Sequence, residues 1–128
     1  MQFEVLGAEA RPAQPGERCA VVDLGSNGAK ARVYAPADEG LAILASQRCE
    51  TQIGKSRVPG VAWALSPAAL TVLDHACVTL DAWLRMQQVS RVVVVATSAI
   101  REAQNGQIWA HQVAQQLGWR VNILPGEL

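Results

Sequence analysis

The chain has 128 residues and a formal net charge of zero, because 11 Lys and Arg residues balance 11 Asp and Glu residues. A neutral chain offers no basic surface for duplex nucleic acid, and no apolar run approaches the roughly 20 residues that cross a bilayer. The first residues also lack the basic and apolar regions of a signal peptide. We therefore expect a single domain whose partners include neither nucleic acid nor a membrane.

The three cysteines, Cys19, Cys49 and Cys77, are odd in number and far apart in the sequence. They form no Cys-x-x-Cys pair, and neither histidine stands near a second pair of ligand-type residues, so a zinc site is not expected. Free thiols that pack as small apolar side chains indicate a reducing compartment, and we expect the protein in the cytoplasm. A Cys–His nucleophile is the alternative, but no feature selects one of the three thiols.

The first half of the chain predicts three strands after an N-terminal arm. Residues 1–17 contain two prolines and two glycines and are predicted to form a flexible arm, which leaves residues 18–128 as the folded domain. A continuous apolar run within residues 18–24 is typical of a buried central strand. Residues 29–35 alternate apolar and polar side chains, as a half-buried strand does, and residues 41–49 predict a third strand. The short turns between these strands indicate an antiparallel meander.

A long helix is predicted next. Ser66 before Pro67 is typical of a helix start. A helix over residues 67–87 follows from apolar residues that recur at spacings of three and four, namely Leu70, Leu73, Cys77, Leu80 and Leu84. Asp74 and Asp81 are predicted to lie off this apolar face.

The last third of the chain predicts two further strands and a second long helix. Residues 91–96 are too apolar for an edge strand, and residues 97–104 predict a turn with a short helical stretch. A helix over residues 106–117 ends at Gly118, and residues 119–124 form the last strand. The order β-β-β-α-β-α-β predicts an α/β fold with a five-stranded mixed sheet. The strand after each helix should return parallel, beside the first strand, through a right-handed crossover.

One candidate binding loop closes the first strand, with the sequence Asp23-Leu24-Gly25-Ser26-Asn27-Gly28. Glycines allow backbone N–H groups to approach an anion, and Ser26 and Asn27 add side-chain donors. Asp23 cannot bind a phosphate by itself, so we expect it to hold a metal ion or to orient a water molecule. An ordinary hairpin turn is the alternative, because Asn-Gly is a common hairpin signal.

The second candidate loop follows the strand at residues 91–96 and runs from Thr97 to Asn105. It lies at the carboxyl end of a strand, where open α/β sheets bind ligands. Thr97 or Ser98 can cap a short helix, and Arg101 offers a planar fork for phosphate oxygens on the same helical face as Asn105. A capped helix with a solvated arginine is the alternative.

Two such loops at one edge of a sheet fit a known family. Residues 19–127 resemble the amino-terminal subdomain of the exopolyphosphatase and guanosine pentaphosphate phosphatase (Ppx/GppA) family, which belongs to the actin-like ATPase superfamily. The resemblance rests on four segments: Ala20-Val21-Val22-Asp23-Leu24-Gly25-Ser26-Asn27, Leu65-Ser66-Pro67-Ala68-Ala69-Leu70, Val95-Ala96-Thr97-Ser98-Ala99-Ile100-Arg101-Glu102-Ala103-Gln104-Asn105-Gly106 and Ile123-Leu124-Pro125-Gly126-Glu127.

The resemblance implies a ribonuclease-H-like half-domain with the element order given above. It implies hydrolysis of a terminal phosphate from inorganic polyphosphate or from guanosine pentaphosphate (pppGpp), with Mg²⁺ offsetting the phosphate charge in the full-length enzyme. By the same resemblance Asp23 is the expected metal contact, and Ser98 and Asn105 shape the loop from which Arg101 reaches the phosphate chain. The phosphate-binding residues implied are Asp23, Gly25, Ser26, Asn27, Ser98, Arg101 and Asn105.

The chain departs from the family pattern at two places. The family continues the first loop with Ser-x-Arg, whereas this chain has Gly28 and Lys30, which lose a hydroxyl and a planar fork. The catalytic Glu of the family stands just beyond the position of Glu127, and the second phosphate loop and the facing subdomain come later still. We therefore expect no catalytic residue in this chain and no metal bound to it alone.

Two interpretations of the function follow from this. In the first, the chain is the N-terminal subdomain of a phosphohydrolase, inactive alone, with the second subdomain of the same protein as its partner. In the second, it is a naturally short, non-catalytic module for phosphate binding or assembly, which pairs with a separate subdomain or with itself as a homodimer. Half of a sugar or acetate kinase is disfavoured, because the loop from Thr97 to Asn105 resembles the phosphatase branch.

Overall fold

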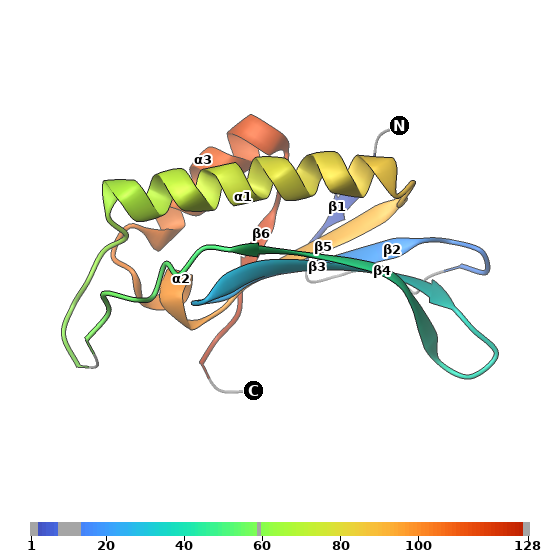
Figure 1. Ribbon diagram of the computed structural model, residues 1–128, viewed down its shortest axis with the longest axis horizontal. Helices are drawn as coiled ribbons and strands as arrows, with labels where there is room; N and C mark the ends of the chain where they lie inside the picture. Colours follow the sequence, from blue (N-terminus) through green and yellow to red (C-terminus); the bar gives the residue numbers. More distant parts are fainter. Residues whose placement is uncertain (1–2, 8–13, 59, 127–128) are drawn as a thin grey trace.

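The computed structural model describes residues 3–7, 14–58 and 60–126 and contains a six-stranded mixed sheet (Figure 1). None of its helices, within the described residues, is long and apolar enough to cross a membrane. The elements in chain order are β1 (Glu4–Leu6), β2 (Cys19–Leu24), β3 (Gly28–Pro36), β4 (Leu41–Glu50), α1 (Pro67–Met86), β5 (Arg91–Ala96), α2 (Ser98–Glu102), α3 (Gly106–Leu117) and β6 (Val121–Ile123).

The sheet has the strand order β1-β5-β2-β3-β4, and β6 also pairs with β5. Strands β2, β3 and β4 form the predicted antiparallel meander. Strand β5 runs parallel to β2 in the register Cys19↔Arg91 to Leu24↔Ala96, as predicted. Both strands therefore end at the same edge of the sheet. Strand β6 also returns parallel, but it pairs with β5 and not with β2, so the prediction that it lies beside the first strand is wrong.

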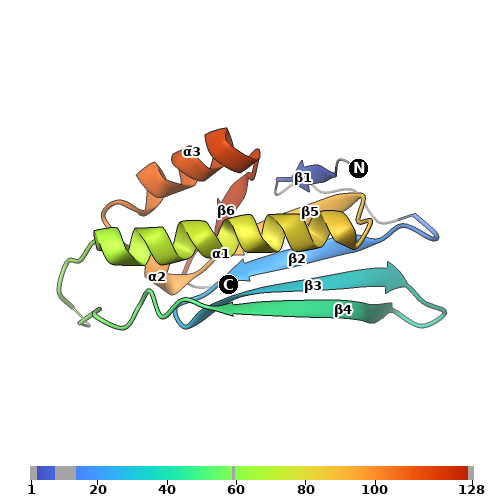
Figure 2. The same cartoon turned by 45° about the horizontal axis from the view of Figure 1, so that its top comes forward.

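Strand β1 places residues 4–6 of the predicted flexible arm, residues 1–17, in the sheet, whereas residues 1–2 and 8–13 of that arm lie outside the described residues. Strand β1 pairs with the first half of β5, through Glu4↔Arg91 to Leu6↔Val93, while β6 pairs with the second half (Figure 2). Because β6 is only three residues long, it pairs with only half of the side of β5 that faces away from β2, and the backbone groups of the other half need a second strand. The apolar segment at Val5 and Leu6 fills that half, and it gives the sheet one strand more than we predicted.

Helices α1 and α3 both lie on one face of the sheet (Figure 1). The burial of β2 therefore alternates: Val22 is fully buried against the helices, whereas Val21 on the other face is 38% exposed. The prediction that residues 18–24 are buried on both faces is wrong for this reason. A continuous apolar run identifies a central strand but does not reveal which of its faces is covered.

The predicted apolar face of α1 is confirmed, and the helix also buries Ala76 and Asp81. Leu73, Cys77, Leu80 and Leu84 are fully buried in the core, and Ser66 caps the helix by accepting a hydrogen bond from the Ala69 N–H. Gly118 ends α3 with φ of 71°, as predicted.

The two aspartates predicted to lie off that face bind tryptophans instead. Trp109 Nε1 donates to Asp74 Oδ1 at 2.8 Å, and Trp119 Nε1 donates to Asp81 Oδ1 at 2.9 Å. Asp81 is buried and Asp74 is half-buried, because α3 and the residues after it pack beside α1. The sequence does not show that these two aspartates face the indole N–H groups of Trp109 and Trp119, so their burial could not be predicted.

Candidate functional site

The turn between β2 and β3 is not the ordinary hairpin turn that Asn-Gly signals. A type I′ turn needs positive φ at both central residues, but none of residues 25–28 has a positive φ. A Cβ at Gly28 would lie 2.8 Å from Arg48 Nη2, the movable end of a half-exposed side chain, and in tight contact with the Cys49 carbonyl oxygen of β4 at 3.2 Å. The turn therefore does not account for Ser26 and Asn27.

The turn leaves backbone donors free. Gly25 N–H donates to the Gly28 carbonyl at 3.1 Å and closes the turn. The N–H groups of Ser26 and Asn27 donate to no acceptor among the described residues. Successive free N–H groups in a turn form a concave anion site.

The two predicted loops meet at the carboxyl ends of β2 and β5. Ser26 Oγ lies 3.2 Å from Ser98 Oγ, although the two residues are 72 positions apart. The Thr97 N–H also donates to the Leu24 carbonyl at 3.3 Å, which continues the parallel pairing into the loops. The convergence predicted from the sequence is thus confirmed for Ser26 and Ser98.

Arg101 lies on the same short helix, α2, three residues after Ser98. Its Nη1 donates to the Leu124 carbonyl at 3.1 Å, and its guanidinium packs on Gly126, where a Cβ would lie 3.5 Å from Cζ. Its other N–H groups donate to no described residue, so part of the fork stays available to a ligand.

Contrary to the prediction, Asn105 does not share a helical face with Arg101, because α2 ends at Glu102 and Ala103 is extended. Its Oδ1 accepts a hydrogen bond from the Leu65 N–H at 2.8 Å, and its Nδ2 donates to the Leu65 carbonyl at 3.0 Å. Both ends of the amide thereby hold the segment before α1 against the start of α3. These two bonds agree with the expectation that Asn105 shapes the loop from Thr97 to Asn105.

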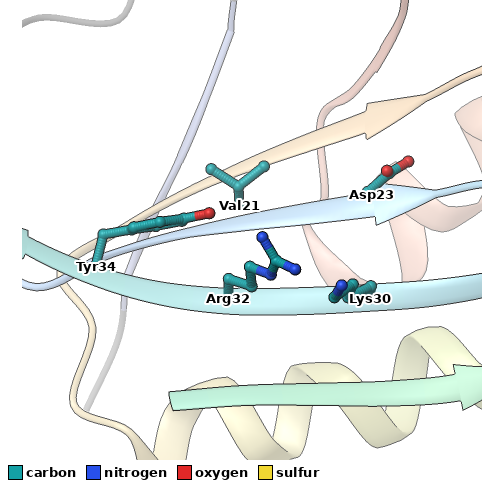
Figure 3. A pocket seen from close by; sticks show the side chains of 5 residues that line it. All are labelled: Val21, Asp23, Lys30, Arg32 and Tyr34. Carbon is teal, nitrogen blue, oxygen red and sulfur yellow. The ribbon is translucent and has the colours of Figure 1, made fainter. Parts of the chain in front are cut away.

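Asp23 lies in a shallow pocket of about 200 Å³ on the face of the sheet that the helices leave open. Figure 3 shows the five lining side chains, which are Val21, Asp23, Lys30, Arg32 and Tyr34. Asp23 is opposite Lys30 in the β2–β3 register. Among the described residues no cluster of three or more His, Cys, Asp or Glu side chains could hold a metal ion, so Asp23 is a single carboxylate beside two cations.

Sequence reasoning did not include Arg32 and Tyr34 in the site. The pattern in β3 does place them on one face with Lys30, because residues two apart point to the same side of a strand. The pattern does not show that the helices leave this face uncovered, so the three side chains are indistinguishable from polar residues on any solvent-exposed face. None of these three side chains makes a hydrogen bond or ion pair with a described residue.

Comparison with known proteins identifies the family of this chain. A sequence model of the Ppx/GppA phosphatase family matches residues 33–128. The chain belongs to the Ppx/GppA phosphatase family. The matched range begins after the β2–β3 turn, so the first loop stands outside it. A search of curated protein sequences finds no match.

Solved structures show the fold of this Ppx/GppA family member. The Aquifex aeolicus Ppx/GppA enzyme matches with a TM-score of 0.75 and 24% identity, over 84% of this chain and 36% of that one. An exopolyphosphatase from Cytophaga hutchinsonii matches with a TM-score of 0.75 and 18% identity, over 84% of this chain and 34% of that one. An exopolyphosphatase-like protein matches with a TM-score of 0.76 and 21% identity, over 86% and 33%. The chain thus spans about a third of the length of these proteins.

Proposed function

We propose that this chain forms one wall of the cleft of a phosphohydrolase that removes the terminal phosphate from inorganic polyphosphate or pppGpp. The contact between Ser26 and Ser98 carries the proposal, because it joins two polar loops at the carboxyl ends of parallel strands. Ligands of open α/β sheets bind at such a place. Membership in the Ppx/GppA phosphatase family supports phosphate as the group that is bound.

Each group of the site has a part in this proposal. The free N–H groups of Ser26 and Asn27 and the two serine hydroxyls donate to phosphate oxygens. Donors fixed in advance stabilise the charge that develops as a phosphoanhydride bond breaks. Arg101 adds the part of its guanidinium that Leu124 leaves free, and Lys30 adds a positive charge beside the turn.

Asp23 is the residue that would contact a magnesium ion. Mg²⁺ is commonly held by one or two carboxylates together with the phosphates of a substrate, which suits a lone carboxylate beside the loop. The bound ion would offset the negative charge of the phosphates. The residues described here do not form a complete metal site by themselves.

We assign no general base to this chain. The chain spans about a third of its structural relatives, and we propose that the base and the second phosphate loop come from the second subdomain. A single wall cannot exclude water around the substrate, so the chain alone should release no phosphate from polyphosphate or pppGpp.

Three free cysteines suit a protein of the reducing cytoplasm.

Titration of the ¹⁵N-labelled chain with inorganic tripolyphosphate tests the proposal. The amide resonances of Ser26, Asn27 and Ser98 should shift together, and Ser98→Ala should weaken binding. Ser46→Ala is the matched control, because Ser46 is exposed on β4, away from both loops. Saturating tripolyphosphate that leaves these amides unshifted would overturn the phosphate site.

A further inference from the structure

The segment of residues 51–54, which follows β4, holds both carbonyl groups at the tip of the β2–β3 turn. The Asn27 carbonyl accepts hydrogen bonds from the N–H groups of Thr51 at 3.2 Å and Gln52 at 3.0 Å. The Ser26 carbonyl accepts one from the Gly54 N–H at 3.0 Å. Figures 1 and 2 show the chain leaving β4 beside the tip of the β2–β3 hairpin.

These bonds fix the direction of a free donor in the turn. In a planar trans peptide the carbonyl and the following N–H point in opposite directions. Because the Ser26 carbonyl points toward Gly54, the Asn27 N–H points away from residues 51–54. The segment therefore orients one of the N–H groups that we assign to phosphate.

Gln52 adopts a backbone conformation that a non-glycine residue seldom adopts, with φ of 53°. Such a conformation persists where the surrounding contacts determine it. The Thr51 and Gln52 N–H groups both donate to the Asn27 carbonyl, and the turn at Gln52 redirects the chain that follows, in which the Gly54 N–H donates to the Ser26 carbonyl.

Gly54 is required by contact rather than by conformation. Its φ is not positive, so its backbone would accept alanine. A Cβ at this position would lie 2.9 Å from Ser26 Cβ and 3.3 Å from Ser26 Oγ, which is closer than side chains approach one another. The Ser26 side chain thus lies between Gly54 and the Ser98 hydroxyl.

We infer that Gly54 is a positioning residue of the phosphate site, which holds Ser26 against Ser98 and directs the Asn27 N–H toward the anion. This inference rests on the proposed function, because it gives residues 51–54 a part in the same site. A methyl group at position 54 displaces Ser26. Hydrogen bonds weaken steeply once the donor leaves its short range of distances and angles.

The test is the Gly54→Ala chain, titrated with inorganic tripolyphosphate under the same conditions as the wild type. Affinity should fall by about tenfold or more, a loss that one misplaced charge-assisted donor can cause. The ligand-free resonances of Ser26 and Ser98 should also move. Gly7→Ala is the control, because a Cβ there meets only the movable guanidinium end of the exposed Arg120.

A double variant separates positioning from general destabilisation. Ser26→Gly removes the Cβ that Gly54→Ala would strike, so in that background Gly54→Ala should have no further effect on affinity. If Gly54→Ala lowers the affinity equally in the wild-type and in the Ser26→Gly background, the inference is overturned. Wild-type affinity in the Gly54→Ala chain would also overturn it. Unmoved Ser26 and Ser98 resonances in ligand-free Gly54→Ala would overturn the positioning itself. A wild-type chain that binds no tripolyphosphate would overturn the proposed function, and the inferred part in anion binding would fall with it.

Discussion

Replacing Asp81 with alanine should destabilise the fold by about 2–3 kcal/mol. Trp119 is fully buried and donates its Nε1–H to Asp81 Oδ1 at 2.9 Å. Removing the acceptor leaves a buried donor unpaired, which costs about 1–3 kcal/mol. The variant also loses the bond from Arg85 Nε to Asp81 Oδ2 at 3.0 Å, a helix ion pair of about 0.3–0.5 kcal/mol because the Arg85 side chain is 42% exposed to solvent.

Urea unfolding followed by far-ultraviolet circular dichroism measures this loss and does not depend on the tryptophans. Asp81→Asn keeps an acceptor for Trp119 and should lose only about half as much. In a Trp119→Phe background, which removes the donor, Asp81→Ala should cost about 1–2 kcal/mol less than in the wild type. Asp38→Ala in the exposed turn before β4 is the control and should change stability by less than about 0.5 kcal/mol. An equal cost of Asp81→Ala in both backgrounds would refute the hydrogen-bond argument.

Further predictions concern the core, the pH dependence of stability and the site. Leu73→Ala or Leu80→Ala should each cost about 2–5 kcal/mol in urea unfolding, because both side chains are fully buried; less than about 1 kcal/mol would contradict their place in the core. Burial raises the pKa of the Cys77 thiol from 9.0 to about 12, so the unfolded chain releases this proton at a lower pH than the folded chain does. Stability should therefore fall as the pH rises above about 9, and Cys77→Ala should reduce that slope; equal slopes would contradict the assignment. In an active phosphohydrolase that joins this domain to a second subdomain, as we propose, Arg101→Ala should lower kcat/KM more than Arg101→Lys, because lysine keeps the charge without the fork.

Most of the sheet could be predicted from local patterns. The parallel pairing of β2 with β5 followed from two short apolar runs, which are visible in the sequence, and from the general right-handedness of crossover connections. Strand β1 could not be predicted, because three residues show no periodicity and its stability comes from the free half of an edge. The aspartate–tryptophan bonds of α1 were also hidden, since a buried acceptor and a solvated one look alike in a sequence.

The candidate site shows the same division. Its two loops could be found, because each one follows a predicted strand and carries small polar residues in an unusual order. The segment at residues 51–54 could not be found, because its contacts with the β2–β3 turn are tertiary and its residues carry no motif. The open face beside Asp23 was missed for a related reason: alternation in β3 gives two faces, and only packing decides which one the helices cover.

The geometry of the β2–β3 turn argues against one of the two interpretations that Asn27-Gly28 left open, the ordinary Asn-Gly hairpin turn. If the turn were of the Asn-Gly hairpin type, the residue choice would follow from positive φ angles, and no ligand would be needed to explain it. Residues 25–28 have no positive φ, and a Cβ at Gly28 would be in tight contact with the Cys49 carbonyl oxygen of β4 at 3.2 Å. Ser26 and Asn27 are therefore not required by the backbone of the turn. Their carbonyls are tied to residues 51–54, their N–H groups are free, and the Ser26 hydroxyl meets Ser98 from a loop 72 residues away. The carbonyls of Ser26 and Asn27 are engaged while their N–H groups are free, and these two free donors support our proposal that the phosphate of the substrate binds at this edge of the sheet.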